Sequence, residues 1–437
     1  MRKVTRKEKR GKENKINFFE EFIKLQKHFF KDIIKRLKSV KDPRHKSYIE
    51  YEPEVILFPV IMKNVCGIGS MSSMTEKFNK DECIENISMV LGCNLEELPH
   101  YDTINNFLCG LEPEEIEKIR DYMIKELFRK RSLEGFRLLG KYWCIAVDAT
   151  GLYSFSERHC EHCLKREYTN KETGEIDRTV YYHNVLEAKL IAGDMVFSIA
   201  TEFIENEDEN VSKQDCEINA FKRLAEKLKK KYPRLPICIL GDSLYACEPV
   251  FEICASNSWK YLIRFKEGRI KSVASEFNTI KEIEGESREQ CTWVNGIVYN
   301  KRTVNLIEAE IEVEKETKVY TFITDVKITK RNADVIVSFG RSRWKIENEG
   351  FNNQKTKRYH IEHANSLDYN AMKNHYLITQ LVDILRQLYE KGIDKIRDLN
   401  KSIKEISSSL LESFRMRLLT KVEDMLHEEN RMQIRFL

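Results

Sequence analysis

The sequence predicts an α/β protein in which a central sheet follows a helical N-terminal region and precedes a helical tail. Two short apolar runs, residues 143–147 and 235–241, each stop directly before an aspartate. Amphipathic helical patterns separate the strand-like runs, as expected for a sheet whose central strands are buried. A third observation is that residues 266–328 replace this alternation of strands and helices with alternating strands, which predicts an all-β insertion.

The N-terminal region is expected to be helical. Apolar side chains recur at helical spacing over residues 18–37, and residues 53–137 continue in helical pieces broken by glycine and proline. Residues 99–108 have the pattern of a capped helix, with Asp102 or Thr103 as the cap. Such a helix can enter a DNA groove in a helix-turn-helix unit, but packing in an ordinary helical hairpin is the simpler interpretation.

The middle of the chain contains the expected strands and helices of the sheet. Gly193-Asp194 is a hairpin-type turn, and Asn295-Gly296 is the strongest short hairpin signal in the insertion. The expected strands are residues 143–147, 184–191, 195–201, 235–241, 261–265, 304–313 and 318–326, with a hairpin over residues 292–299. The expected helices are residues 214–231, 245–254, 333–359 and, in the tail, 370–437.

Charge is distributed unevenly along the chain. Residues 1–46 hold seventeen Lys and Arg residues against six Asp and Glu, so this segment carries +11 of formal charge while the whole chain carries +4. A cationic arm suggests a polyanionic partner, because each Lys or Arg that meets a phosphate releases condensed counterions. The alternative is a solvated leader segment without a partner.

Hydropathy and cysteine usage predict the compartment. No apolar run approaches the ~20 residues that span a bilayer, and the basic first residues lead into no secretory signal, so no membrane partner is expected. The twelve cysteines are scattered rather than ordered into a disulfide framework. This usage is typical of a reducing compartment with buried thiols, so we expect a cytoplasmic protein.

Three acidic residues are the candidate catalytic and metal-binding residues: Asp148, Asp242 and Glu347. The aspartates follow apolar strands, at the sheet edge where side chains emerge into a crevice, and Glu347 lies within the expected helix 333–359. Carboxylates that converge in one crevice repel each other unless a cation neutralises them. Magnesium prefers such oxygen ligands, and two ions can support a phosphoryl displacement. Taken alone, an acid at a strand end is more often a cap.

The sequence around these acids resembles a known family. Val-Asp148-Ala-Thr-Gly, Gly-Asp242-Ser-Leu-Tyr and Arg343-Trp-Lys-Ile-Glu347 are similar, in this order, to the Asp-Asp-Glu transposases of bacterial insertion sequences. The subgroup that it resembles has a ribonuclease H-like catalytic fold with a β-rich insertion, and the resemblance covers about residues 40–390. It implies metal-dependent DNA strand cleavage at element ends and strand transfer into target DNA, with two Mg2+ or Mn2+ ions. It also implies that double-stranded DNA is the partner of a homodimer or larger assembly.

The resemblance further implies which basic residues hold DNA and which glutamate completes the acidic group. Four basic residues around the expected glutamate helix would grip phosphates beside the cut: Arg343, Lys355, Lys357 and Arg358. Glu349 is a rival to Glu347 as the third acid, but residues two apart on a helix point to nearly opposite faces, so only one can serve. Glu347 keeps the spacing from Arg343 that the family has.

A second candidate site follows the first aspartate. His159-Cys160-Glu-His162-Cys163 combines a Cys-x-x-Cys pair with two histidines, a spacing that suits zinc. A structural zinc site needs four ligands, so His159 or His162 would be joined by a distant residue such as His183. The alternative is a pair of free or redox-active thiols.

The chain is divided into six predicted regions. They are a basic arm and helix (1–46), a helical N-terminal domain that would suit DNA binding (47–137), the first part of the catalytic domain (138–265), the β-rich insertion (266–328), the second catalytic part with the glutamate helix (329–390) and a helical C-terminal tail (391–437). Two alternatives to a transposase remain. One is a ribonuclease H-like nuclease without strand transfer, and the other is a transposase-derived DNA-binding protein that has lost catalysis.

Overall fold

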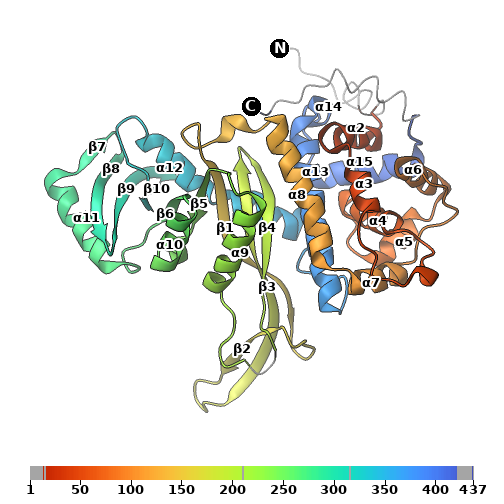
Figure 1. The fold of residues 1–437 in the computed structure, drawn as a ribbon, viewed down its shortest axis with the longest axis horizontal. Coiled ribbons are helices and arrows are strands. Elements are labelled where there is room, and N and C mark those ends of the chain that lie inside the picture. The colour runs from red at the N-terminus through yellow and green to blue at the C-terminus, as the bar shows by residue number, and fades with distance from the viewer. Residues whose placement is uncertain (1–12, 14–15, 209–210, 314–315, 421–435, 437) are drawn as a thin grey trace. The chain divides into compact units, whose positions relative to one another are not determined.

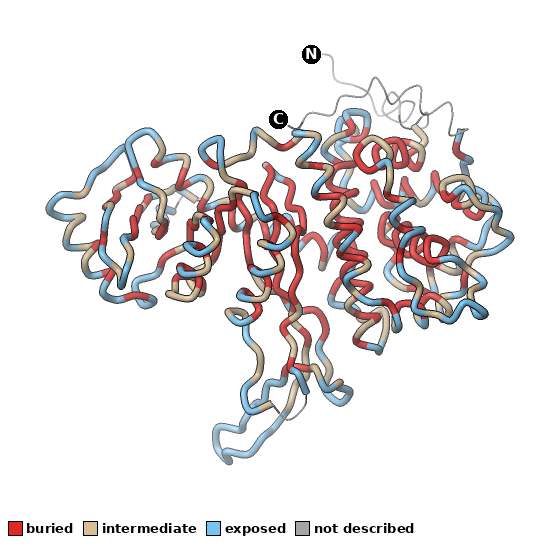
Figure 2. Tube along the Cα trace, in the orientation of Figure 1, coloured by how far each residue is buried: buried red, intermediate tan, exposed pale blue. Residues whose placement is uncertain are grey.

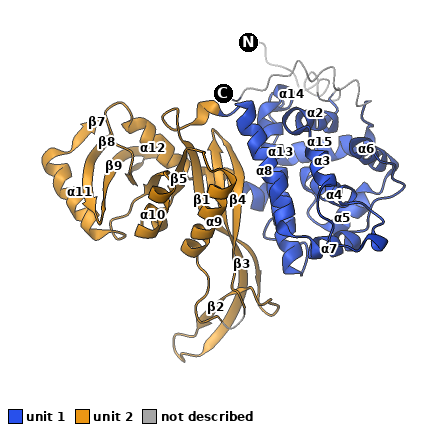
Figure 3. Ribbon diagram, viewed as in Figure 1, with its two compact units in different colours: residues 1–133, 352–437 blue, residues 134–351 orange. Residues whose placement is uncertain are grey.

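The structure, a computed structural model, divides into two compact units. It describes residues 13, 16–208, 211–313, 316–420 and 436. Unit 1 consists of residues 1–133 together with 352–437, and unit 2 consists of residues 134–351 (Figure 3). Residues 1–12 and 14–15 of the predicted basic arm and helix lie outside the described residues, as do residues 421–435 and 437 of the predicted tail. The six predicted regions are finer than this division and stay predictions.

Unit 1 is helical, and both ends of the chain build it (Figure 1). Its helices are α2 (Phe18–Phe30), α3 (Ile33–Lys38), the short 3-10 helix η1 (Lys46–Tyr48), α4 (Pro53–Val65), α5 (Met71–Phe78), α6 (Asp81–Leu91), α7 (Tyr101–Gly110), α8 (Pro113–Lys130), α13 (Tyr369–Gly392), α14 (Asp394–Arg397) and α15 (Ile403–Met416). Helix α4 is buried along its whole length, and α13 along nearly all of it. Helix α13 packs against α4, α7 and α8, so the tail supplies the centre of a core begun by the N-terminal region.

Two details of unit 1 differ from the prediction. The expected helix 18–37 is two helices, α2 and α3, because the chain turns at residues 31–32. Helix α7 is capped by His100 rather than by Asp102 or Thr103: the His100 Nδ1 accepts the backbone N–H of Asp102 at 3.4 Å. An imidazole nitrogen one position before the helix performs the task for which the pattern suggested a carboxylate or hydroxyl.

Unit 2 is built on one mixed sheet, which confirms the α/β class. Among the described residues the sheet has ten strands in the order β2-β3-β1-β5-β6-β10-β9-β8-β7, with β4 paired to β3. The strands are β1 (Trp143–Phe155), β2 (Leu164–Thr169), β3 (Ile176–Ala192), β4 (Met195–Ile204), β5 (Ile237–Gly241), β6 (Lys260–Arg264), β7 (Glu286–Arg288), β8 (Cys291–Tyr299), β9 (Arg302–Val313) and β10 (Glu316–Thr324). Strands β1, β5 and β6 are parallel, while β3 is antiparallel to β1 and β4.

The helices of unit 2 follow the predicted alternation. They are the short 3-10 helices η2 (Glu134–Phe136) and η3 (Ser243–Tyr245), the α-helices α9 (Glu217–Lys231), α10 (Glu248–Ser256), α11 (Lys271–Glu284) and α12 (Ala333–Ser342), and the π-helix η4 (Ile346–Phe351). A further π-helix, η5 (Asn353–Arg358), begins unit 1 where it resumes. The predicted turn at Gly193-Asp194 is confirmed, and Gly193 adopts the left-handed φ of +60° that such a turn requires.

The insertion is not all-β as predicted, because it contains α11. This helix buries Val273, Ala274 and Phe277 and packs on β8, so an amphipathic pattern was present within residues that otherwise alternate. Strand β10 pairs antiparallel with β6, and the inserted strands therefore extend the same sheet (Figure 1).

The predicted hairpin at Asn295-Gly296 is wrong. Strand β8 runs straight through these residues, and the register against β9 shifts there, which is a β-bulge. Gly296 has φ +82°, and the Asn295 side chain bonds to the backbone of Ile328 through both its oxygen and its nitrogen, at 2.9 Å each. The left-handed glycine thus serves a bulge instead of a chain reversal.

Burial concentrates in the central strands of unit 2 (Figure 2). Strand β5 is buried at every residue, whereas β3 is exposed at its start and buried over its second half. The exposed start of β3 and β2 form a two-stranded projection, residues 164–182, which we call the β-arm (Figure 1). None of the helices in the described part of the chain is both long and apolar enough to cross a membrane.

Candidate active site

The two predicted aspartates lie at the same level on neighbouring parallel strands. Strands β1 and β5 pair in register up to Ala146 opposite Leu240, and each aspartate comes two residues later. Strand β5 ends at Gly241, so Asp242 leaves the sheet, whereas β1 continues beyond Asp148. Both aspartates are half-buried. This edge of the sheet is where parallel strands commonly present functional side chains.

Gly241 allows the chain to turn sharply after β5. A Cβ at this position would lie 2.8 Å from the Cβ of Tyr245, closer than side chains tolerate. The tight turn brings η3 back over the strand, and the Asp242 Oδ1 caps it by accepting the Leu244 N–H at 2.8 Å. The capping bond fixes the orientation of the Asp242 carboxylate and occupies a lone pair of one of its two oxygens.

Glu347 reaches the same group from the π-helix η4. The buried side chain of Ile346 anchors this helix, which packs against β1 and β4. Burial, with contributions from the negative charges of Asp242 and Glu347, raises the pKa of Asp148 from its usual value to about 6. The three predicted acids therefore lie within electrostatic reach of one another, and π-helical turns often occur at functional sites.

Arg343 opposes this repulsion from within the site. Its Nη1 lies 3.1 Å from the Asp148 Oδ2, the guanidinium is nearly buried, and its charge lowers the pKa that burial raises. The guanidinium also sits 4.7 Å from the ring centre of Trp344. A buried arginine held in this way orients the Asp148 carboxylate.

Glu349, the rival third acid, is exposed, whereas Glu347 is half-buried. The charge of Glu347 is one of those that raise the pKa of Asp148. The difference in burial agrees with the spacing argument that separates residues two apart on a helix.

A fourth carboxylate, Glu217, lies beside the predicted acids. It starts α9, and its Oε1 accepts the hydroxyl of the buried Tyr245 at 2.6 Å. Burial raises the pKa of Glu217, and the charges of Asp148 and Asp242 raise it further. An acid in the first turn of a helix usually just complements the helix dipole, so the sequence carried no signal for this placement.

The predicted DNA-contacting residues are divided between the two units. Arg343 belongs to the site in unit 2, whereas the other three lie in unit 1. Lys357 is exposed, and the Lys355 Nζ pairs with Glu362 at 2.9 Å. Arg358 is buried, and its Nη2 lies 2.7 Å from the Glu390 Oε2. A guanidinium buried in such a pair does not present itself to a phosphate, so we assign Arg358 a structural task.

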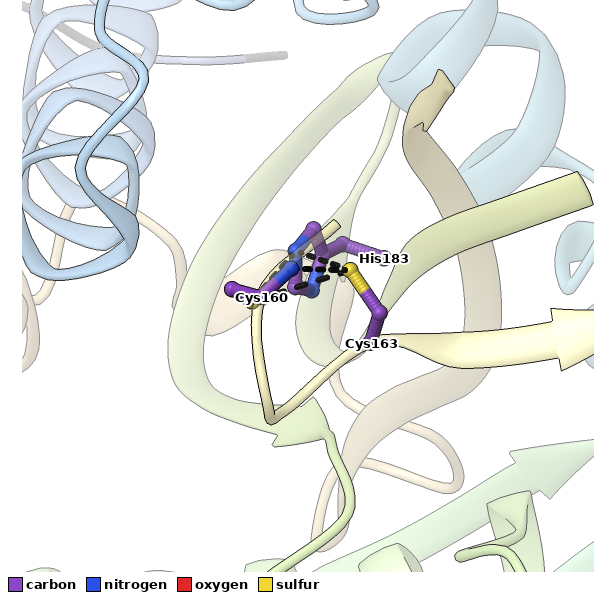
Figure 4. A group of neighbouring side chains, drawn as sticks. All are labelled: Cys160, Cys163 and His183. Atoms are coloured by element: carbon purple, nitrogen blue, oxygen red, sulfur yellow. Dashed lines mark hydrogen bonds between the residues drawn. The ribbon is translucent and has the colours of Figure 1, made fainter. Parts of the chain in front are cut away.

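The predicted Cys-x-x-Cys pair lies close to a histidine from β3. Cys160, Cys163 and His183 point toward one another (Figure 4). The nearer histidines of the motif lie apart from this group: the His159 ring stacks on Tyr181, and the His162 Nδ1 is 2.9 Å from the Asn206 carbonyl oxygen. The structure thus selects the distant histidine rather than either adjacent one.

One segment of the chain is similar to a known protein family. Residues 34–123 match the model of a protein family described as DDE_Tnp_1-associated. This match indicates a relation to DDE-type transposases, and it covers helices of unit 1 rather than the segments that carry the acids. The search of curated proteins found no match.

Proposed function

We propose that this protein is a transposase that cleaves DNA strands at element ends and transfers them into target DNA, with Asp148, Asp242 and Glu347 as its catalytic acids. The observation that carries the proposal is their convergence, in which the charges of Asp242 and Glu347 both act on the half-buried carboxyl of Asp148. The family match of residues 34–123 supports the same class independently, since it involves none of these residues.

The sheet order supports a ribonuclease H-like catalytic fold. Within the order β4-β3-β1-β5-β6, strands β1, β3 and β4 are antiparallel neighbours, and β5 and β6, which follow them in the chain, add in parallel on the other side of β1. The first acid then stands on the central strand and the second just beyond its parallel neighbour. The strands β7–β10 come between the second acid and Glu347, as the resemblance implies for the β-rich insertion.

The donor set fits divalent magnesium or manganese. All three predicted ligands offer carboxylate oxygens, and a cation there would offset the mutual repulsion and burial of Asp148. When bound, a pair of such ions supplies an activated water or hydroxyl and stabilises the leaving oxygen of the phosphodiester. In this proposal Arg343 orients Asp148, the Leu244 N–H orients Asp242, and η4 positions Glu347.

The test uses the full-length protein and labelled DNA from the end of its own genomic element. With magnesium or manganese we expect nicking at the element boundary and then joined products. Asp148→Ala, Asp242→Ala and Glu347→Gln should each reduce cleavage by more than the about 10- to 100-fold that loss of a supporting residue costs. Glu349→Gln is the matched control, because this exposed residue lies two positions from Glu347, and it should keep activity.

Other outcomes would redirect the assignment. Cleavage without any joined product would indicate a nuclease, and metal-independent binding without cleavage would indicate a DNA-binding protein that has lost catalysis. Loss of activity in Glu349→Gln with retention in Glu347→Gln would exchange the two glutamates. DNA binding is expected to weaken with salt, because phosphate contacts release counterions.

A further inference from the structure

The Cys160, Cys163 and His183 donors form a triangle with the dimensions of a metal site. The Cys160 and Cys163 Sγ atoms are 3.6 Å apart, and the His183 Nε2 lies 3.4 Å and 3.3 Å from them. In a tetrahedral zinc site, bonds of about 2.3 Å to sulfur and about 2.0 Å to nitrogen place two sulfurs about 3.8 Å apart and sulfur and nitrogen about 3.5 Å apart. Each edge of the triangle is within a few tenths of an ångström of these values.

The chemistry of the group also favours a cation. Two thiols and an imidazole are the sulfur and nitrogen donors that Zn2+ takes in proteins. The two sulfurs are well beyond the about 2.05 Å of a disulfide bond, so the pair is not bonded in this conformation.

The loop that carries the cysteines is already fixed in position. Asn206, just after β4, donates its Nδ2–H to the Cys163 carbonyl at 2.9 Å and its backbone N–H to the His162 carbonyl at 3.2 Å. Cys163 and His183 are buried, whereas Cys160 is half-buried. The surrounding backbone therefore holds the group in position, and solvent reaches it at Cys160.

The group lies at the point in the sheet where the β-arm begins. His183 lies where β3 changes partner: Tyr182 pairs with Leu164 of β2, and Asn184 pairs with Ile204 of β4. The register between β1 and β3 shifts at the same level. The cysteine loop connects β1 to β2 across this point, which is the root of the β-arm.

We propose that Cys160, Cys163 and His183 bind one Zn2+ that fixes the β-arm to the body of the sheet, with solvent as the fourth ligand. Among the described residues no further His, Cys, Asp or Glu joins the three donors, and Cys160 is only half-buried, so we assign the fourth position to solvent. On binding, the two thiols release their protons to solvent and the metal takes both thiolates and the neutral imidazole. This site is separate from the acidic group, so it stands or falls independently of the proposed transposition.

The first test measures the zinc content of the purified full-length protein by elemental mass spectrometry. We expect about one zinc ion per chain, lost in Cys163→Ser and in His183→Ala. His159→Ala and His162→Ala are matched controls from the same motif, and Cys216→Ser tests an exposed cysteine of the same unit. All three controls should keep the metal, with circular dichroism reporting whether each variant folds.

A second measurement keeps the proposal testable if the ligand variants do not fold. Cobalt added to chelator-treated wild-type protein should give thiolate-to-cobalt charge transfer and the visible bands of tetrahedral cobalt, and zinc should remove both. Absence of zinc and of these bands would overturn the site, and loss of zinc in His159→Ala with retention in His183→Ala would overturn the ligand set. Chelation should also speed proteolysis within residues 164–182; unchanged cleavage there would overturn the role in fixing the β-arm.

Discussion

Asp148, which we propose as a catalytic acid, makes the folded protein less stable when its carboxyl is ionised. Burial raises its pKa to about 6, so the carboxyl is protonated in the folded protein below that pH. Above that pH the carboxylate is ionised, and its burial lowers the free energy of unfolding. Stability from this group is therefore fully present below its ordinary pKa of about 3.9 and is lost as the pH rises through about 6. Arg343, in contact at 3.1 Å, offsets part of the penalty.

We therefore predict that Asp148→Asn stabilises the metal-free protein at pH 8 by about 1–2 kcal/mol while it abolishes cleavage. The amide removes the charge and still accepts a hydrogen bond from Arg343. Chemical denaturation of both proteins in the presence of a chelator measures the difference. The gain should shrink toward pH 4, where wild-type Asp148 is protonated in the folded state; an equal gain at both pH values would contradict this explanation.

Glu217 is the residue whose role the sequence did not reveal. Its hydrogen bond with Tyr245 and its electrostatic interaction with Asp148 and Asp242 place it beside the acidic group. We predict that Glu217→Gln lowers the cleavage rate by about 10-fold, as for supporting residues around a metal site. Glu226→Gln, an exposed glutamate on the same helix, should leave the rate unchanged. Equal rates in all three proteins would restrict Glu217 to a helix-start role.

A site residue could be predicted when the local sequence pattern fixes its place in the fold, and could not when it comes from a distant segment of the chain. Asp148 and Asp242 were predicted because each directly follows an apolar strand, and parallel neighbours bring such ends together. Glu217 and His183 come from other elements, and nothing in the local pattern states which face each one presents. His159 and His162 were favoured as zinc ligands by adjacency alone, although their loop directs them to Tyr181 and Asn206 instead.

At the scale of elements, the insertion shows that an Asn-Gly pair occurs both in hairpin turns and in β-bulges. Asn-Gly favours a tight turn because glycine adopts positive φ, and a bulge needs the same conformation. Asn305 decides between them: its Oδ1 accepts the Gly296 N–H at 3.0 Å, so the bulge stays within a continuous strand. This contact comes from the neighbouring strand β9 and was not visible in the local sequence.

The bulge gives a prediction about Gly296, whose φ is +82°. A Cβ there would meet nothing within 4 Å, so substitution costs conformational energy and not a clash. We predict that Gly296→Ala destabilises the protein by about 1 kcal/mol, because a residue with a Cβ has a conformational energy higher by about that amount in the left-handed region. Urea denaturation measures it, with Gly268→Ala as the control: this glycine has equally open space and no positive φ. A similar cost at both positions would show that φ is not the cause.

At the scale of the whole molecule, unit 1 depends on contacts between distant parts of the chain. Arg386 on α13 donates from its Nη1 to the Val65 carbonyl and, at 3.0 Å, to the Ser407 hydroxyl. Its Nη2 lies 2.7 Å from Glu390, which also pairs with Arg358. One glutamate therefore neutralises two buried guanidiniums that link an N-terminal helix to three later segments. Such a unit could be recognised as helical from its sequence pattern, but not as assembled from both chain ends.

We predict that Glu390→Gln destabilises unit 1 by about 3–5 kcal/mol at pH 7, because Arg386 loses its carboxylate partner and Arg358 keeps only the longer contact with Asp383, at 3.8 Å. Burial alone would raise the pKa of Glu390, but Arg358 and Arg386 hold it below its ordinary value. Its stabilising contribution is thus present above about pH 4.3 and is lost as the pH falls through the lower, folded-state pKa. In thermal denaturation, the loss of stability in the variant relative to the wild type should accordingly be largest near neutral pH and smaller in acid.

The control is Glu412→Gln, a change at an exposed glutamate of α15, which should alter stability by less than about 0.5 kcal/mol. A deficit that persists unchanged into strong acid would mean that the glutamate contributes packing and not charge.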